Sequence, residues 1–136
     1  LVEKKLKISD DNTIILGCGD KIDKDSKFLG AIKFFWDNNS DFINRVWNDC
    51  FIGMTGVMIP YALFNRIGVF PEHLRYSEDY YWILRSTLSE NVNYKFIPEI
   101  IYKKRIHQIR LSDQYSNEII ANIPVIKKEI MDTYGK

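Results

Sequence analysis

The sequence predicts an α/β fold, a mixed sheet with flanking helices. Short β-branched runs alternate along the chain with segments that place apolar residues at helical spacing, and this order is typical of layered α/β proteins. The chain has 136 residues, of which 46% are hydrophobic, enough to bury a core. No internal repeat or low-complexity linker divides it. We therefore expect residues 1–136 to belong to a single domain.

The first elements are predicted as follows. Residues 1–8 resemble the end of a surface helix, and residues 9–12 have turn chemistry. Residues 13–18 are apolar and β-branched, as in a strand, and the polar residues 19–26 are expected to turn the chain back as a hairpin. The aspartates in this polar segment do not match the spacing of a calcium-binding EF-hand loop, so a solvated loop is expected.

Two helices and an apolar run are predicted in the middle of the chain. Residues 40–47 form the pattern of a capped helix with one apolar face. Residues 51–59 are apolar and contain two glycines, which permit close approach by another backbone or a ligand. Pro60 fits the first turn of a short helix over residues 61–66, which is expected to end at Gly68.

Two proline-containing segments follow further along the chain. Residues 94–103 predict either two short strands or one strand bent at Pro98, because proline is poorly tolerated inside a central strand. A final helix is expected from Ser116. Pro124 removes one backbone donor within it, so we expect a kink or two shorter helices.

Charge and cysteine content exclude several functional classes. Nineteen basic and eighteen acidic residues give a net charge of +1, so no overall field attracts nucleic acid or an anionic membrane. Cys18 and Cys50 form no CxxC pair, which argues against zinc; we expect reduced, buried thiols, and a disulfide stays open. No apolar run reaches the ~20 residues that span a bilayer, and the start lacks a signal peptide. A cytoplasmic protein is expected.

The sharpest local signal is YSEDYYW at residues 76–82. A helix over residues 77–89 is predicted here, with Ser77 as its N-cap. Acidic residues in a first turn complement the helix dipole, worth ~0.3–1 kcal/mol each. Alternatively, Asp79 acts as a general base, in which case the helix N-terminus is expected to keep its carboxylate ionised and its pKa low.

A second signal is the basic run KKRIHQIR at residues 103–110. If a strand continues through it, Arg105 and His107 share one face and together address an anion or a metal. A solvated strand end is the alternative, and we prefer it for Lys103 and Lys104.

Taken in order, these segments resemble family 2 glycosyltransferases of the GT-A fold. Residues 51–60 look like the strand after the donor site, and residues 67–72 (IGVFPE) are similar to the family's "vGgFdE" turn. SED at residues 77–79 matches the acidic "ED" motif, and WILR at residues 82–85 matches "wlR". Residues 102–112 are similar to the "yR.H....S" ending. The resemblance covers most of the chain from Thr13 to Ser112.

The chain departs from the family in two ways. Val69 and Pro71 replace the usual Gly and Asp of the turn, although Glu72 is retained. The family's first half, a nucleotide-binding sheet that ends in a DxD metal motif, has no counterpart. The chain therefore looks like the C-terminal half of a GT-A domain, a partial domain that begins at Leu1 without Met.

The resemblance implies roles for individual residues. Asp79 would be the catalytic base of an inverting transferase. His107 would be a metal ligand for Mg²⁺ or Mn²⁺, whose main ligands would be the missing DxD motif. The expected substrate-binding residues are Met54, Thr55, Gly56, Glu78, Trp82, Arg105 and Arg110.

The resemblance also implies partners. The full-length enzyme would take a nucleotide-sugar donor and a glycan acceptor and would bind no nucleic acid, and this half alone is expected to be inactive. The sheet edge left by the absent half invites a homodimer. Peripheral association with the inner face of the membrane would run through parts not present. The alternative function is a noncatalytic α/β interaction module with an exposed aromatic surface of Tyr76, Tyr80, Tyr81 and Trp82.

Overall fold

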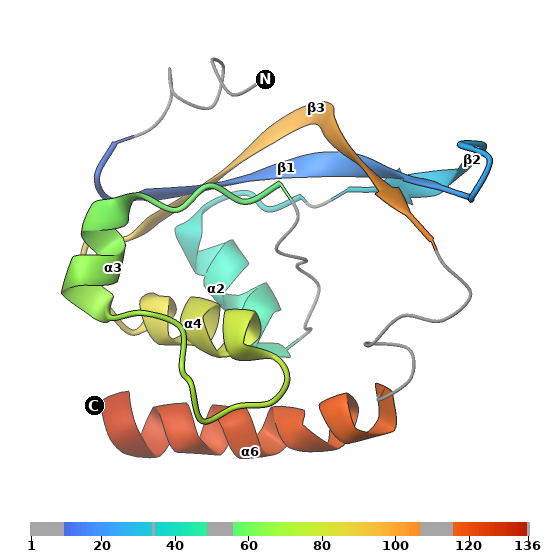
Figure 1. Cartoon of the computed structure of the whole chain (residues 1–136). Coiled ribbons are helices and arrows are strands. Elements are labelled where there is room, and N and C mark those ends of the chain that lie inside the picture. The colour runs from blue at the N-terminus through green and yellow to red at the C-terminus, as the bar shows by residue number, and fades with distance from the viewer. Residues whose placement is uncertain (1–9, 34, 49–55, 107–115, 136) are drawn as a thin grey trace.

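The computed structural model describes residues 10–33, 35–48, 56–106 and 116–135, and in them a three-stranded sheet and four helices (Figure 1). The sheet forms one layer. Helices α2 and α4 lie beneath it, and α4 packs in turn against α6. The predicted α/β class with a mixed sheet is confirmed. The elements are β1 (Thr13–Ile22), β2 (Phe28–Ile32), α2 (Asn39–Asn48), α3 (Tyr61–Ile67), α4 (Glu78–Thr87), β3 (Asn93–Arg105) and α6 (Ser116–Tyr134).

Strand β1 is the centre of the sheet. It pairs with β2 in antiparallel and with β3 in parallel orientation, in the order β2-β1-β3. The predicted strand extends four residues further, to Ile22, and the predicted hairpin then turns at Asp23, whose carboxylate accepts the N–H groups of Asp25 and Lys27 at 2.8 and 2.9 Å. This aspartate therefore closes a turn, as expected for a solvated loop.

Residues 93–105 form one continuous strand, β3. Of the two alternatives at Pro98, the single strand is therefore confirmed. The register with β1 jumps from Gly17 opposite Ile97 to Cys18 opposite Ile100, so the proline lies in an irregularity of the ladder. Because β3 has a ladder partner on one side only among the described residues, the missing N–H of the proline breaks no central hydrogen bond.

The predicted strand over residues 51–59 lies partly outside the described residues. In its described part, Met58 exchanges both backbone hydrogen bonds with Ile15 of β1, at 2.8 and 3.0 Å. This single antiparallel bridge attaches the segment before α3 to the centre of the sheet. The predicted helical end over residues 1–8, and Cys50, also lie outside the described residues.

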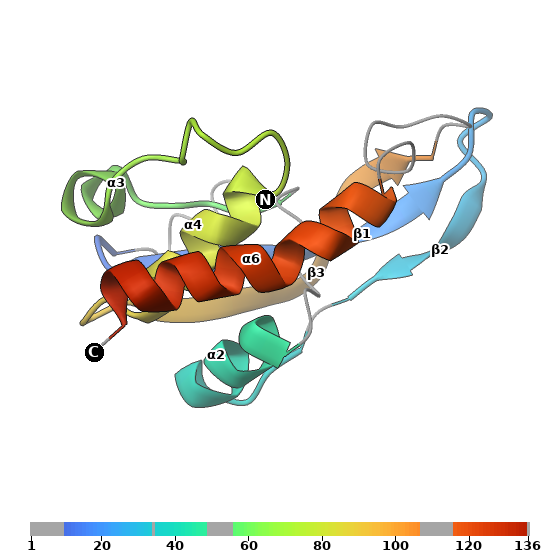
Figure 2. The same ribbon diagram turned by 90° about the horizontal axis from the view of Figure 1, so that it is seen from below.

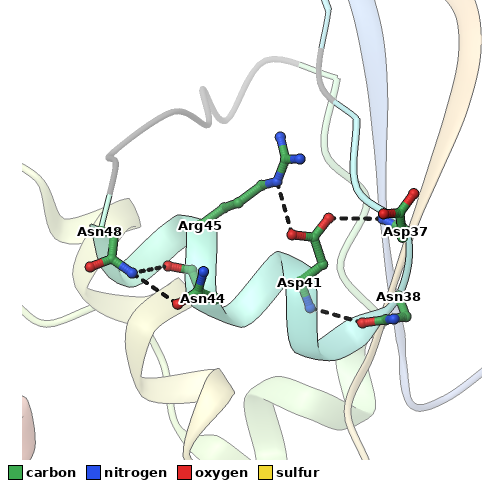
Figure 3. A network of polar contacts seen from close by, with 6 residues as sticks. All are labelled: Asp37, Asn38, Asp41, Asn44, Arg45 and Asn48. Carbon is green, nitrogen blue, oxygen red and sulfur yellow. Dashed lines mark hydrogen bonds and ion pairs between the residues drawn. The ribbon is translucent and has the colours of Figure 1, made fainter.

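Helix α2 has a different cap from the one expected at Ser40. The Asn38 side chain accepts the N–H of Asp41 at 2.9 Å, and the Asp41 carboxylate accepts the N–H of Asp37 at 2.9 Å (Figure 3). Arg45 donates to the same carboxylate at 3.1 Å. An asparagine side chain readily accepts from the free N–H of a residue three positions later in the chain. The helix therefore begins one residue earlier than predicted.

Two sequence signals, Gly68 after α3 and Pro124 within α6, can be compared with the structure. Gly68, at φ 111°, terminates α3 as predicted, and its N–H bonds the Phe64 carbonyl at 2.9 Å. Helix α6 runs through Pro124 as a single helix, so the expectation of two shorter helices is wrong. Two fully buried residues past the proline, Ile126 and Ile130, hold this half of the helix on the core.

The core lies between the sheet, α4 and α6. Figure 2, seen from below, shows α6 passing across the molecule with α2 and α3 on opposite sides. The thiol of Cys18 is buried and free, as predicted. In the described part of the chain, no helix combines the length and apolar character that crossing a membrane requires. The fully buried side chains include Ile14, Ile15, Leu16, Phe42, Leu63, Trp82, Ile83 and Leu84.

Three glycines make room for the side chains of two residues from β3. A Cβ atom at Gly17 would overlap Ile101, and one at Gly19 would overlap the Tyr102 ring. A Cβ atom at Gly56 would lie 2.6 Å from the Tyr102 ring, nearer than van der Waals contact allows. The Tyr102 ring and the glycine backbones therefore pack directly together, and burial raises the pKa of the Tyr102 hydroxyl.

We predict that Gly19→Ala lowers the free energy of unfolding by roughly 1–3 kcal/mol, because the added methyl group displaces the Tyr102 ring from a packed position. Denaturant unfolding measures the change. Lys21→Ala on the same strand, where the side chain is exposed, is the control and should change stability by less than about 0.5 kcal/mol. Equal stabilities of the two variants would contradict the packing described here.

Candidate functional site

The first turn of α4 is built differently from the predicted Ser77 cap. Ser77 has φ 62° and ψ 27°, in the left-handed region, and its hydroxyl makes no capping hydrogen bond. The Asp79 carboxylate instead accepts the N–H of Tyr80 at 2.7 Å. A non-glycine residue in this conformation is strained and persists only when its surroundings impose it. The turn before α4 is therefore held by the packing of α4 and not by the serine side chain.

Asp79 is half-buried, and this burial changes the pKa predicted for its carboxyl group. Burial raises the pKa of its carboxyl group above the ordinary value, and the negative charge of exposed Glu78 raises it further. The hydrogen bond from the Tyr80 N–H opposes this shift. The expectation of a low pKa is wrong, because desolvation outweighs the backbone hydrogen bonds that favour the charged carboxylate. A more basic carboxylate is the better proton acceptor.

The aromatic residues around this motif are anchors within the core. The Tyr80 hydroxyl donates to the Val46 carbonyl at 2.6 Å, and the Trp82 indole donates to the Gly68 carbonyl at 2.6 Å. Their rings are buried, as is that of Tyr81. Tyr76 is buried too, so these four side chains do not form the exposed aromatic surface that was predicted for an interaction module.

The turn at Gly68 packs directly against helix α4. The Trp82 ring contacts Phe64 and Phe70, at centroid distances of 5.0 and 6.1 Å. The guanidinium of Arg85 lies against Gly68, where a Cβ atom would be 2.8 Å from its nitrogen, and also stacks over a ring of α6. The two motifs that resemble "vGgFdE" and "wlR" are thus in direct contact.

A shallow, open cavity of about 440 Å³ adjoins the segment that leads into α4. Arg75 and Tyr76 line one wall, with the guanidinium 5.1 Å from the ring centroid, and Glu118 and Asn122 of α6 line the other. Asp79 follows Tyr76 by three positions but is not itself a lining residue. The wall contains a cation, a carboxylate, an amide and an aromatic ring, which are groups that hydrogen-bond and stack on polar ligands.

Three of the other predicted site residues have structural contacts of their own. Trp82 is 0% exposed, so its indole supports α4 and does not face a ligand. Gly56 is covered by Tyr102, and a side chain therefore fills the space expected for substrate. Arg105 binds the β1–β2 turn through the carbonyls of Asp23 and Lys24 at 2.7 and 2.9 Å. Met54, Thr55, His107 and Arg110 lie outside the described residues.

Within residues 10–33, 35–48, 56–106 and 116–135, no three histidine, cysteine, aspartate or glutamate side chains converge as a metal site. The implied Mg²⁺ or Mn²⁺ stays a prediction, because His107 lies outside the described residues and the other implied ligands belong to the missing DxD motif. The chain matches no protein-family model and no curated protein. The resemblance to family 2 glycosyltransferases thus depends on the order of the motifs alone.

Sequence reasoning missed the contribution of α6. Glu118 and Asn122 line the cavity, and Glu129 binds His73 Nε2 at 2.8 Å and accepts from the Tyr81 hydroxyl at 3.4 Å. No signal in the sequence joins these residues to the acidic motif, because about forty residues separate them and only packing brings them together.

We predict that Trp82→Phe lowers the free energy of unfolding by roughly 1–3 kcal/mol, because it keeps most of the ring and leaves the Gly68 carbonyl without its donor. Trp47→Phe is the matched control. Its indole donates to the Thr87 hydroxyl, which itself donates to the Leu84 carbonyl and keeps that bond. Chemical denaturation compares the two, and a larger loss from the control would contradict this anchoring role.

We predict that Asp79→Asn raises the thermal stability of the chain at neutral pH. The raised pKa means that wild-type stability is greatest below the usual carboxyl pKa and is lost as pH rises through the raised value. Asparagine carries no charge to desolvate and can still accept the Tyr80 N–H. Tm should therefore rise at about pH 7.5 and converge with wild type near about pH 3.5. Asp25→Asn, at an exposed position outside this turn, is the control and should change Tm little at about pH 7.5.

Proposed function

We propose that this chain is the acceptor-side half of an inverting, family 2-like glycosyltransferase, with Asp79 as its catalytic base. The donor is a nucleotide-diphosphate sugar and the acceptor a hydroxyl of a glycan or polysaccharide precursor. The observation that supports this proposal best is the half-buried Asp79 carboxylate, held at the start of a rigid helix with a raised pKa.

The proposed reaction needs one proton acceptor on the acceptor side. The acceptor oxygen attacks the anomeric carbon, the bond from that carbon to the diphosphate oxygen breaks, and its electron pair leaves with the diphosphate. The hydroxyl proton passes to the Asp79 carboxylate as the new bond forms. A base with a pKa closer to the working pH accepts this proton more effectively.

The surroundings of Asp79 support the positioning that such a step requires. Helix α4 is anchored by the Trp82 and Tyr80 hydrogen bonds, which limits movement of its first turn. The cavity beside Tyr76 offers polar groups to an acceptor bound next to that turn. Contacts to the nucleotide, and the divalent cation that would stabilise the leaving diphosphate, are proposed to come from residues outside the described part of the chain.

We predict that Asp79→Asn in the full-length protein lowers turnover by roughly 10²–10⁴-fold, because general base catalysis is lost. Nucleotide-sugar binding should change little. Release of nucleoside diphosphate from a panel of sugar donors measures turnover, and calorimetry measures donor affinity.

The control is Asp132→Asn on α6, an exposed carboxylate paired with Lys128, which should keep wild-type turnover. Wild-type turnover by Asp79→Asn with the natural acceptor would remove Asp79 as the base. A full-length protein that turns over no nucleotide sugar would remove the transferase proposal itself.

A further inference from the structure

Two lysines stand side by side where the parallel strands β1 and β3 end. Lys21 and Lys104 are partners in the ladder, and each is the last residue but one of its strand. Neighbouring strands lie about 4.8 Å apart, and partners in a ladder project to the same face of the sheet. The two lysine side chains therefore share one face.

This face is turned away from the helices. Ile14 and Leu16 of β1 belong to the core that α4 and α6 complete. Side chains alternate along a strand, so Lys21 projects to the opposite side of the sheet. Helices α2, α4 and α6 all lie beneath the sheet (Figure 1). The sheet itself therefore separates the two lysines from the candidate site at Asp79.

The two positive charges are not neutralised within the described part of the chain. Neither Lys21 nor Lys104 has an ion pair there. Asp20 projects to the other face, where its ladder partner is Lys103, and the Asp23 carboxylate is used by two N–H groups of its turn. Like charges directly opposite one another weaken a sheet. An anion between the two lysines would remove this repulsion.

The sheet is open beside the two lysines. Gly30 of β2 is the ladder partner of Lys21 on its other side. A Cβ atom at Gly30 would meet nothing within 4 Å beyond its own neighbours in the chain. In the next row the Tyr102 ring packs on Gly19 and bounds the opening. Ligands of open α/β sheets bind at the carboxyl ends of parallel strands, and this opening lies at such an end.

A compact dianion suits this opening best. Two ammonium groups match the charge of a phosphate group, whose oxygens accept from several donors at once. A carboxylate brings a single charge and leaves part of the repulsion in place. A long polyanion such as nucleic acid is disfavoured, because Asp23 and Asp25 lie in the turn after β1 and the net charge of the chain is only +1.

We propose that Lys21 and Lys104 bind a phosphate or diphosphate group on the open face of the sheet. Each ammonium group donates to a phosphate oxygen, and the bare backbone at Gly30 leaves room for the rest of the ligand. The phosphate belongs either to a free nucleotide or to a lipid headgroup, and the experiment separates these two sources. This site does not depend on catalysis at Asp79.

The test is a ¹H–¹⁵N NMR titration of the full chain at low ionic strength with pyrophosphate, uridine diphosphate and a DNA oligonucleotide. We expect pyrophosphate to shift the backbone signals of Lys21, Gly30 and Lys104, and its binding to weaken as salt screens the charges. Cosedimentation with vesicles of phosphatidic acid, compared with phosphatidylcholine, completes the test. Tighter binding of uridine diphosphate than of pyrophosphate assigns the site to a nucleotide, and cosedimentation with phosphatidic acid alone assigns it to a lipid.

Lys21→Gln and Lys104→Gln should each weaken pyrophosphate binding by about tenfold, because one charged donor is lost. Each should also slightly raise the Tm of the ligand-free chain, because the repulsion between the two ammonium groups disappears. Lys103→Gln is the matched control. It removes the same charge from the neighbouring residue of β3, whose side chain projects to the opposite face, and should leave binding within about twofold of wild type.

Several results would overturn the proposal. It fails if neither pyrophosphate nor uridine diphosphate shifts these signals at millimolar concentration and phosphatidic acid captures no protein. It also fails if Lys103→Gln weakens binding as much as Lys104→Gln, or if the DNA oligonucleotide binds more tightly than every small phosphate. A lower Tm of both ligand-free lysine variants would contradict the repulsion on which the site depends. Transferase turnover is measured separately, so failure here leaves the proposal for Asp79 untouched.

Discussion

The hydrogen bond from the Trp82 indole to the Gly68 carbonyl is the contact on which the arrangement around α4 depends. It closes a ring cluster in which Phe64 and Phe70 pack against the indole, and Arg85 covers the same turn from the other side. A buried carbonyl with no donor is costly, so the pairing fixes where α3 ends relative to α4. Because α4 lies between the sheet and α6, its position also determines where the sheet and α6 lie relative to each other.

This burial has an electrostatic consequence at the end of the helix. The Asp79 carboxylate at this end is half-buried, and desolvation raises its pKa although the Tyr80 N–H donates to it. A charged group held in such a place destabilises the fold at neutral pH. The left-handed Ser77 just before it adds backbone strain at the same point.

Much of the fold was predictable, and each failure has an identifiable physical cause. Residues 13–18, 61–66 and the helix after Ser77 were recognised because apolar spacing and glycine punctuation act over a few residues. The α2 cap was misassigned because the Asn38 side chain accepts the Asp41 N–H, and the helix therefore begins before Ser40. Pro98 is tolerated because β3 lies at the edge of the described sheet, a property of strand order that local sequence does not contain.

By itself, the sequence determined which segments form helices and strands, and it identified Asp79 as a carboxylate in the first turn of a helix. Tertiary structure alone decided the environments. It made the Trp82 and Tyr80 rings anchors, assigned Gly56 to the packing of Tyr102, and sent Arg105 to the β1–β2 turn. The physical reason is range: helical spacing and turns depend on neighbours in the chain, whereas burial and pKa depend on residues that only folding brings together.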